Sequence, residues 1–520
     1  MFHSIQPYIT KDEPFGPIDS IDIESSDVKA IDTLFEKHNS IYKKLRQRPS
    51  IIMGRRGAGK THYLKSVFFD KDYNFHVEIK TASVLSHMTQ VVQRMTDDAL
   101  FAESVADLWE IILWASVFGE MRKSRLMDWK ERTMLNEYLQ SIGVQEDENP
   151  EKMLLNLANR LNAQAGKISS MLVLETLRGM NGVTFDEAKR IVINSLERDN
   201  KKFVILMDSL EDFQLNFDSV ERSLKGLLKL VGSMNKPRDR VDIRFCLPSE
   251  VYPRLVEISS NANKDFKRAL KLQWTATELI LIGAHRLTMY LTIFYEDFAR
   301  SIFPLDVSKR NDALKLFHSV LPEKIMNGAG HQEETISYIL RHTQLLPRHL
   351  LMLLNSIFKT SGTTQNLRPF PVTQERIVNS IRQTEGIIAK EIFNAFNLIY
   401  PTAEETCKRC LPELGHKFKI GELHRVFNRH GKAVFGSDDL HDFQRMLLEI
   451  GAVGRVIPGR ESDVYIKGNF EYTVDHELIL SHEDELCVHP LFSGIFGGIK
   501  NERPVYPYGS VLDDEDYRDN

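Results

Sequence analysis

Short apolar runs alternate with helix-like stretches over the first half of the chain. The runs are uninterrupted, which is typical of strands buried on both faces of a parallel sheet. Between them, apolar residues recur three or four positions apart, which predicts amphipathic helices. The predicted strands are 50–53, 74–79, 203–208 and 242–247, and the predicted helices around them are 31–45, 62–69 and 220–234. This alternation predicts an α/β fold with a parallel sheet covered on both faces.

A long helical stretch separates the second and third predicted strands. Its apolar residues form helical faces and no clean run of alternating strands. One face consists of Trp109, Ile112, Leu113 and Val117, and another of Met153, Leu154, Leu157 and Leu161. We therefore expect a helical insertion at about 83–200 within the sheet domain, with contacts that the sequence does not reveal.

The second half of the chain contains two regions whose predicted secondary structure differs from that of the first half. Residues 274–358 predict helices without strands, among them 336–340 and 349–358. Pro369 and Pro371 then indicate a linker, and 380–500 predict a separate small α+β unit before an acidic end, DDEDYRDN, that we expect to be solvated. The predicted domains are an N-terminal segment with a lead-in helix (1–48), the sheet domain (49–272), a helical lid (273–365), the α+β domain (366–500) and an acidic tail (501–520).

The segment GRRGAGKT, residues 54–61, follows the first predicted strand and precedes a helix. Gly54, Gly57 and Gly59 allow the backbone N–H groups to curl around phosphate oxygens, and the helix N-terminus adds partial positive charge. Lys60 is expected to reach the β- and γ-phosphates, and the Thr61 hydroxyl to bind Mg²⁺. Arg55, Arg56, Ala58 and His62 complete the predicted contacts. The alternative, a glycine-rich turn with an accidental Lys-Thr pair, does not account for the flanking strand and helix.

The second part of the predicted nucleotide site is a carboxylate at the end of the third strand. Asp208 follows the apolar run 203–207, where a strand-end aspartate holds Mg²⁺ together with the P-loop hydroxyl. Hydrolysis also needs a group that orients water, often a glutamate directly after this aspartate. Ser209 stands there instead, so Glu211 and Asp212 are the candidates, with helix capping as the alternative for either. Slow turnover is therefore one expectation.

Three further polar residues are candidates for contacting the nucleotide. Ser249 follows the fourth strand, where a polar group can sense the γ-phosphate; a helix N-cap is the alternative. Arg348 begins a helix, where a cation opposes the helix dipole, and a nucleotide phosphate would explain its presence. Arg341 is a second candidate for that role, with a solvated surface arginine as the alternative. ATP is favoured over GTP because no NKxD element, which reads guanine, occurs in the chain.

Composition excludes several other classes of protein. The 520 residues carry a net charge of −5, which gives no global attraction to a polyanion. Four cysteines are too few for a disulfide framework in a chain of this length, which fits a reducing compartment. The N-terminus lacks the pattern of a signal peptide, and the most apolar run, 111–118, is too short to span a bilayer. We expect a cytoplasmic protein with no membrane association.

The motifs GRRGAGKT, VILMDSLED, RFCLPSE, LQWTATELILIGAHRL and RHTQLLPRHLL occur in an order that resembles AAA+-related bacterial ATPases of the STAND and initiator type, over about 15–360. The resemblance implies a P-loop NTPase sheet, a helical lid opening at 274–287, a sensor-2 role for Arg348, and ATP and Mg²⁺ bound between sheet and lid. It also implies ATP-dependent oligomerisation or a nucleotide-gated change. Two departures are the long insertion before Asp208, and Pro248 where many relatives carry arginine.

The C-terminal domain resembles the winged helix that initiator-type ATPases also carry. Helices are predicted at 420–427 and 440–450, a turn at 451–454, and a wing hairpin from 455–457 and 464–466. The supposed recognition helix, 437–450, is acidic and would repel DNA phosphates. Its charged residues are Asp438, Asp439, Asp442 and Glu449 against Arg445, and the basic residues of the wing are Arg455, Arg460 and Lys467. A protein partner is favoured, and DNA binding stays open as the alternative.

Cys407 and Cys410 have the spacing of half a zinc site, but no second pair completes it, and Cys487 and His489 are far away in sequence. We assign no zinc there, and we interpret His489 as a packing residue. The sequence thus predicts an ATP-binding, ATP-hydrolysing switch whose nucleotide state controls oligomerisation or partner binding, with bacterial antiviral defence as a role suggested by similar architectures. The alternative is a DNA-remodelling or loading ATPase that uses the winged helix.

Overall fold

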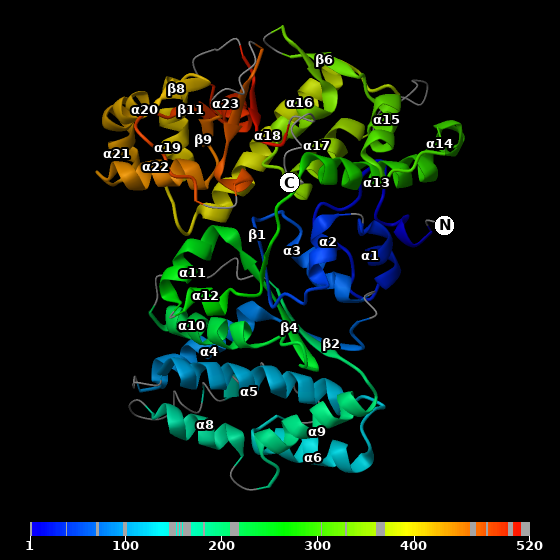
Figure 1. Ribbon diagram of the computed structural model, residues 1–520, viewed down its shortest axis with the longest axis vertical. Coiled ribbons are helices and arrows are strands. Elements are labelled where there is room, and N and C mark those ends of the chain that lie inside the picture. Colours follow the sequence, from blue (N-terminus) through cyan, green and yellow to red (C-terminus); the bar gives the residue numbers. More distant parts are fainter. Residues whose placement is uncertain are drawn as a thin grey trace. The chain divides into compact units, whose positions relative to one another are not determined.

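The computed structural model describes most of the chain (Figure 1). The described residues are 3–37, 39–68, 72–96, 101–144, 152, 155–156, 159, 168–179, 182–208, 218–259, 261–302, 304–327, 330–359, 370–457, 464–474, 477–497 and 503–510. The chain divides into two compact units. Unit 1 comprises Met1–Ser40, Arg55–Gly59 and Gln273–Asn520, and unit 2 comprises Ile41–Gly54 and Lys60–Leu272.

A parallel sheet forms the centre of unit 2. Within its described residues the sheet has the order β2-β3-β4-β1-β5, and every neighbouring pair is parallel. The strands are β1 (Ile51–Gly54), β2 (Phe75–Ile79), β3 (Phe203–Met207), β4 (Val241–Pro248) and β5 (Ala269–Lys271). The four predicted strands and their parallel arrangement are therefore confirmed. The short edge strand β5 was not predicted.

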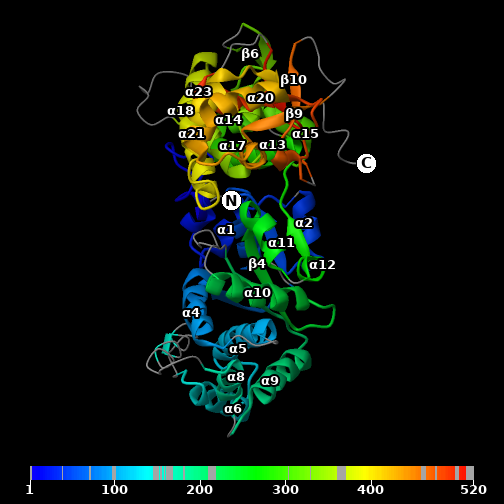
Figure 2. The ribbon, with the colours of Figure 1, turned by 90° about the vertical axis from the view of Figure 1, so that its left-hand side faces the viewer.

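Helices pack around this sheet, and some of them lie at a distance from it. They are α2 (Ser40–Leu45), α3 (Lys60–Lys65), α4 (Thr81–Arg94), α5 (Phe101–Met121), α6 (Trp129–Ser141), α8 (Ser170–Arg178), α9 (Phe185–Arg198), α10 (Asp218–Ser233), α11 (Tyr252–Ile258) and α12 (Ala262–Asp265), with 3-10 turns η3 (Ser66–Phe68) and η4 (Ser249–Val251). Figure 2 shows α10, α5 and then α8 at increasing distance from β4. The apolar residues of α5 and of the sheet belong to one continuous core. The predicted insertion is therefore an integral part of this unit.

The predicted lead-in helix, 31–45, is wrong as a single helix. The structure has α1 (Val28–Leu34) and then α2, with an extended backbone at Phe35 between them (φ −84°, ψ 123°). The Asn39 side chain donates to the carbonyl of Glu36 over 2.7 Å. A side-chain amide that bonds the backbone locally competes with helical bonding, so the helix is interrupted here although the apolar spacing continues.

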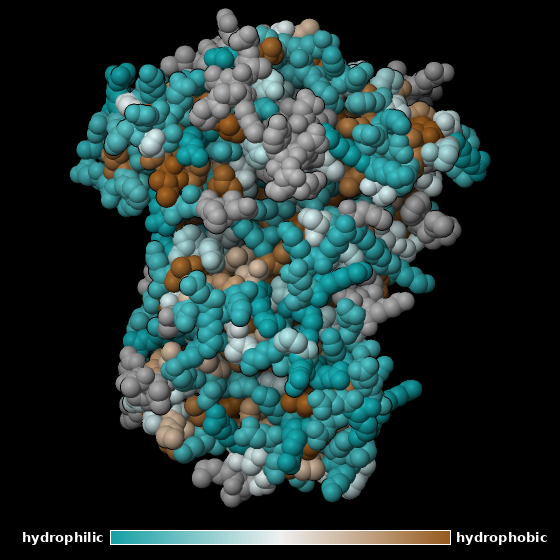
Figure 3. All heavy atoms as spheres, viewed as in Figure 1, coloured by the Kyte–Doolittle hydropathy of each residue, from teal (hydrophilic) through white to brown (hydrophobic). Residues whose placement is uncertain are grey.

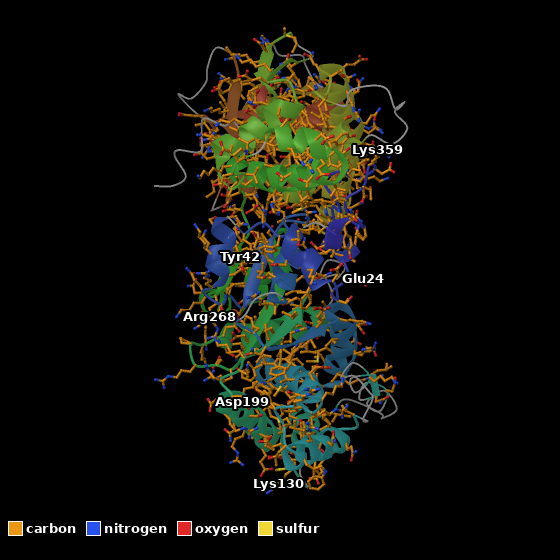
Figure 4. All side chains as sticks on the ribbon, turned by 90° about the vertical axis from the view of Figure 1, so that its right-hand side faces the viewer. Glu24, Tyr42, Lys130, Asp199, Arg268 and Lys359 are labelled. Carbon is orange, nitrogen blue, oxygen red and sulfur yellow. The ribbon has the colours of Figure 1, made fainter. Side chains whose placement is uncertain are left out.

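Unit 1 joins the N-terminal segment to a set of helices. Beside η1 (His3–Ile5), η2 (Ser20–Asp22) and α1, these are α13 (Ala276–Phe294), α14 (Glu296–Ile302), α15 (Arg310–Val320), α16 (Thr335–Arg341) and α17 (Pro347–Phe358). The Asn355 side chain accepts from the Phe15 amide (2.7 Å) and donates to the Gly16 carbonyl (3.0 Å). Lys359, labelled in Figure 4, pairs with Asp12 at 3.0 Å. These contacts tie the N-terminal segment to α17.

The expectation of helices without strands over 274–358 is wrong at one place. Strands β6 (Lys324–Met326) and β7 (Gln332–Glu334) pair as an antiparallel hairpin. The hairpin places Glu333 in a buried position, where its carboxylate accepts two hydrogen bonds from Arg341. Strands of three residues carry too short a pattern to be distinguished from a loop in the sequence.

The C-terminal part of unit 1 is the α+β arrangement that the sequence predicts. Its helices are α18 (Gln374–Phe396), α19 (Ala403–Cys410), α20 (Ile420–Val426), α21 (Lys432–Phe435), α22 (Leu440–Glu449) and α23 (Pro490–Phe496), with turns η5 (Leu411–Glu413), η6 (Phe427–Gly431) and η7 (Glu471–Thr473). The described strands form one sheet in the order β12-β10-β9-β11-β8. They are β8 (Lys417–Lys419), β9 (Val453–Val456), β10 (Ile466–Asn469), β11 (Glu485–Val488) and β12 (Val505–Pro507).

Two details of this sheet differ from the sequence expectation. Strands β9 and β10 are antiparallel, as predicted for the wing, but β9 begins at Val453, inside the predicted turn 451–454, and β10 spans Ile466–Asn469 instead of the predicted 464–466. Residues 505–507, which were assigned to the acidic tail 501–520, form β12 and pair with β10 through Ile466 and Val505. The β12 side chains are buried, because an apolar strand next to β10 extends the core.

On the face drawn in Figure 3, hydrophilic residues predominate and apolar residues form small separate groups. Among the described helices, none combines the length and apolar character that a bilayer crossing would need.

Candidate nucleotide-binding site

The carboxyl ends of the parallel strands provide the frame of the candidate site. In an open parallel sheet, ligands bind outside these ends, where loops carry polar side chains past the last backbone pairing. Strand β4 lies between β1 and β3, and its last residue, Pro248, is in register with Gly54. Asp208 directly follows β3, and Ser249 directly follows β4. The strand order therefore brings Gly54, Asp208 and Ser249 to one edge.

Thr61 and Asp208 lie together, although 147 positions separate them in the chain. The Thr61 hydroxyl, Oγ1, is 3.2 Å from Oδ1 and 3.1 Å from Oδ2 of Asp208. Oxygens at neighbouring vertices of an octahedral magnesium, with Mg–O distances of about 2.1 Å, lie about 3.0 Å apart. The two side chains therefore have the separation that shared coordination of one Mg²⁺ requires.

Few protein ligands are needed for such an ion. Magnesium is usually held by one or two carboxylates, with water and substrate phosphates at its other positions. No cluster of three or more potential metal-binding His, Cys, Asp or Glu side chains occurs in the described parts of the chain. Thr61 and Asp208 fit this sparse mode of binding, in which the nucleotide itself completes the coordination.

Lys60 is the first residue of α3 and is almost completely buried, with 4% of its surface exposed. Its ammonium donates to the carbonyl of Gly54 over 3.1 Å. A buried ammonium is costly unless oxygens surround it, so this position favours a cation that serves an anionic ligand. The Lys60 ammonium thus lies beside Gly54, the last residue of β1. His62, on the same turn of α3, is half-buried.

Residues 55–59 of the loop pack within unit 1. Gly57 (φ +85°) and Gly59 (φ +91°) adopt left-handed backbone conformations that other residues rarely adopt. Ala58 is fully buried, and its carbonyl accepts from the Trp274 indole over 3.0 Å. The backbone of this loop is therefore fixed in a curled form by its glycines and by contacts with the start of the helical lid.

Arg348 contacts the loop directly. It is the second residue of α17, and its backbone N–H donates to the Gly57 carbonyl over 3.3 Å. A Cβ atom on Gly57 would lie 3.0 Å from the Cβ of Arg348. The guanidinium forms an ion pair with Asp19, while its Nε atom is buried and has no hydrogen-bond partner among the described residues.

Charged side chains of both signs lie near Arg348. Burial raises the pKa of the nearby Glu391 carboxyl, whereas the positive charges of Arg348 and Arg56 act in the opposite direction. Two arginines, Asp19 and Glu391 therefore influence one another within unit 1. The two guanidinium groups are thus accompanied by two carboxyl groups, and the phosphate contact predicted for Arg348 stays a prediction.

The side chain of Arg55 points elsewhere than its position in the motif suggests. Its guanidinium donates to Oε1 of Gln344 over 2.9 Å and to the backbone carbonyl of Glu449 over 2.5 Å. It also lies 5.6 Å from the ring centroid of Phe396 and 5.3 Å from that of Tyr472. Sequence reasoning assigned Arg55 to the nucleotide, and no local pattern indicates these distant partners.

The other predicted residues are placed as follows. Glu211 and Asp212 lie outside the described residues. Ser249 begins the short turn η4 and is half-buried; the cap of that turn is Pro248, without a side-chain hydrogen bond. Arg341 is engaged in the buried ion pair with Glu333, at 2.9 Å, which differs from the solvated or phosphate-binding positions that the sequence suggested.

The basic wing residues that the DNA alternative names lie as follows. Lys467 is 7% exposed and its ammonium lies 5.7 Å from the Tyr465 ring centroid. Arg455 bonds the Ile479 carbonyl and lies 3.9 Å from Asp484. Arg460 lies outside the described residues. On α22, Asp439 caps the helix and accepts from the amides of His441 and Asp442.

The cysteines and His489 are parts of the core. All four cysteines are free thiols and are buried. Burial raises the pKa of Cys410 to about 12 and that of Cys407 well above its ordinary value. His489 Nδ1 accepts from the amide of Leu491, so this ring caps α23, and Nε2 lies 2.7 Å from the Tyr472 hydroxyl. Such partners are those of a packing residue.

Comparison with known proteins gives little further information. No protein-family model matches the chain, and no curated protein matches it. Among solved structures, the ORC2 protein of Aeropyrum pernix, described in ADPNP-ADP complexes, is similar over 90% of this chain and 92% of its own, with 12% sequence identity and a TM-score of 0.35. A similarity of this size carries no functional argument, so we base the proposal below on the residues of this chain.

Proposed function

We propose that the chain binds ATP with Mg²⁺ at the loop 54–61 and hydrolyses it as a nucleotide-controlled switch. The observation that carries the proposal is the separation of about 3 Å between the Thr61 hydroxyl and the Asp208 carboxylate, at the carboxyl edge of a parallel sheet. This contact joins the residue after the lysine to a strand-end carboxylate 147 positions further along the chain.

Each residue then has a role that follows from its chemistry. Backbone amides of the loop and of the first turn of α3 donate to the phosphates, which the positive end of the helix dipole also attracts. Lys60 neutralises charge on the β- and γ-phosphates. Thr61 and Asp208 would hold a magnesium ion, which when bound would offset negative charge on the phosphates.

Orientation of the attacking water is assigned to Glu211 or Asp212, which follow β3 by a few residues. Ser249 follows β4, which lies between β1 and β3, and is proposed to sense the γ-phosphate. Arg348 is proposed to stabilise phosphate charge, because its backbone contacts Gly57 within the loop. Slow turnover remains our expectation, since no carboxylate directly follows Asp208.

Equilibrium titration with ATP tests the binding site. Lys60→Ala removes a charged donor to phosphate, which is worth about 1.5–3 kcal/mol, so affinity should fall by roughly 10- to 150-fold. Lys65→Ala, one turn along the same helix, is the matched control and should bind ATP as the unaltered protein does. Equal ATP affinity of the Lys60 variant and this control would refute the assignment.

A second experiment tests whether Asp208 binds Mg²⁺. Asp208→Asn keeps the size of the side chain but removes its charge, so ATP binding should lose most of its dependence on Mg²⁺ while binding without Mg²⁺ changes little. Hydrolysis should fall together with that dependence. If Mg²⁺ strengthens ATP binding equally in both proteins, Asp208 does not hold the ion.

We further propose that the nucleotide state controls assembly or binding of a protein partner. The acidic character of α22 and the burial of Lys467 support a protein partner over DNA. Size-exclusion chromatography with and without a slowly hydrolysed ATP analogue, combined with pull-down using the Lys60 variant as control, tests this proposal. ATP turnover stimulated by DNA, with steeply salt-dependent binding, would instead support the DNA-loading alternative.

A further inference from the structure

Arg55 anchors the loop 54–61 to the end of a helix in the C-terminal domain. Its guanidinium donates to the carbonyl of Glu449, the last residue of α22, over 2.5 Å, and to Oε1 of Gln344 over 2.9 Å. The aromatic rings of Phe396 and Tyr472 both lie within 6 Å of the guanidinium carbon. All of these residues belong to unit 1.

This position suits a cation for physical reasons. The last carbonyls of a helix lack intrahelical donors and carry the negative end of the helix dipole. A guanidinium there satisfies one such carbonyl, and the aromatic faces attract its charge. The Glu449 side chain is already engaged, since it accepts from Arg445 (2.7 Å) and from the Tyr400 hydroxyl (2.8 Å). The backbone carbonyl is thus the group that Arg55 holds.

Gln344 links the same helix end to a second point of the loop. Its amide nitrogen donates to the carbonyl of Ile450 over 2.8 Å, while its amide oxygen accepts from Arg55. Gln344 is 2% exposed, so both contacts are removed from water. Four residues later, the amide of Arg348 donates to the carbonyl of Gly57. One short segment, 344–348, therefore holds residues 55 and 57 and also contacts the end of α22.

We propose that Arg55 couples the conformation of the phosphate-binding loop to the α22–β9 segment, residues 449–453. This inference rests on the proposed function, because phosphate would order the backbone of residues 55–59. Because the Arg55 guanidinium is held at the end of α22, a sufficiently large change in the loop backbone at residue 55 moves that helix end or breaks the hydrogen bond. Coupling is reciprocal, so the C-terminal domain also biases ATP affinity through the same side chain.

Arg55 differs in this respect from the other variable residues of the motif. Ala58 has no polar side chain, and Arg56 contributes to the electrostatic neighbourhood of Glu391. The Arg55 side chain hydrogen-bonds both Gln344 and the helix end at Glu449. The signal from the site to the C-terminal domain is therefore assigned to one side chain that can be removed.

Hydrogen exchange of the full chain tests the proposal first without nucleotide. Arg55→Ala should increase amide exchange in 449–453 by at least about tenfold, as expected for losing a hydrogen bond from a charged group. Gln344→Ala should also increase exchange there, because it removes the hydrogen bond to the Ile450 carbonyl together with one acceptor of Arg55. Arg300→Ala is the matched control, because Arg300 is an exposed arginine of α14 that pairs with Glu296. Unchanged exchange in both variants would overturn the anchor.

The second measurement adds a slowly hydrolysed ATP analogue at saturation, checked by titration for each variant. The unaltered protein and the Arg300 variant should show a nucleotide-dependent change of exchange in 449–453, and Arg55→Ala should lose it while the loop still binds nucleotide. Arg55→Lys, which keeps the charge but not the two-pronged geometry, should retain only part of it. A full nucleotide-dependent change in Arg55→Ala would overturn the coupling. Absence of nucleotide binding in the unaltered protein would instead contradict the proposed function, and the nucleotide-free comparison would still decide the anchor.

Discussion

Arg348 at the start of α17 and Arg341 at the end of α16 were first and second candidates for one role in the sequence, and their substitution should have different consequences. Arg341 is buried and bonds both oxygens of Glu333, at 2.9 and 3.1 Å. Glu333 also accepts from Asn327 and from the Tyr506 hydroxyl. Arg341→Met would leave this carboxylate buried without its cation, which costs about 3–5 kcal/mol. Unit 1 should therefore lose much of its stability, with no direct loss of a nucleotide contact.

The pH dependence of that loss follows from Glu333. Burial alone would raise the pKa of Glu333, but Arg341 and the hydrogen bonds from Tyr506 and Asn327 outweigh burial and hold it below the ordinary value. In the unaltered protein this lowered pKa contributes stability above the unfolded pKa, and the contribution is lost as pH falls through the folded pKa. In Arg341→Met burial dominates and the folded pKa rises, so the destabilisation should be largest near neutral pH and smaller in acid.

Urea unfolding monitored by hydrogen exchange of β7 and α16, combined with ATP titration, checks both statements. Arg341→Lys serves as a milder variant that keeps the charge and should remain folded enough for titration. Arg348→Ala is the comparison: it should weaken ATP binding more than it destabilises unit 1. The reasoning is refuted if Arg341→Lys loses ATP affinity at unchanged stability, because Arg341 would then serve the nucleotide.

Three further predictions concern the backbone, a helix cap and the thiols. Gly57→Ala and Gly59→Ala should each lower the free energy of unfolding by about 1–2 kcal/mol, because alanine is strained in the left-handed region. Gly57→Ala should lower it further than Gly59→Ala, because its Cβ would crowd Arg348. Equal unfolding midpoints of the two variants would contradict that contact. Thr275→Ala removes the capping box of α13 and should cost about 1 kcal/mol in urea unfolding, whereas Thr275→Ser should restore most of it. Because burial raises the pKa of Cys410 and Cys487 to about 12, both thiols stay protonated at pH 8, and rapid alkylation of the native protein would be incompatible with this burial.

The sequence predicted best where one local pattern determines the structure. Strands β1, β3 and β4 are buried along their whole length, so their apolar runs are uninterrupted and visible. The three-residue strands β5 and β12 were missed because pairing with a neighbour, and not an intrinsic pattern, makes them strands. The break between α1 and α2 was missed for a related reason, since Asn39 interrupts a helical spacing that continues on both sides.

The candidate site shows the same division between backbone and side-chain information. Glycine spacing fixes the shape of a loop, and a strand-end aspartate is placed by the sheet, so Thr61 and Asp208 were paired from the sequence. The side chains of Arg55 and Arg56 carry no such constraint, because the motif leaves their positions variable. Their roles depend on partners that are hundreds of residues away in the chain, as Glu449 is for Arg55. A motif therefore predicts the chemistry that the loop backbone performs, whereas its variable side chains are free to connect that chemistry to the rest of one particular protein.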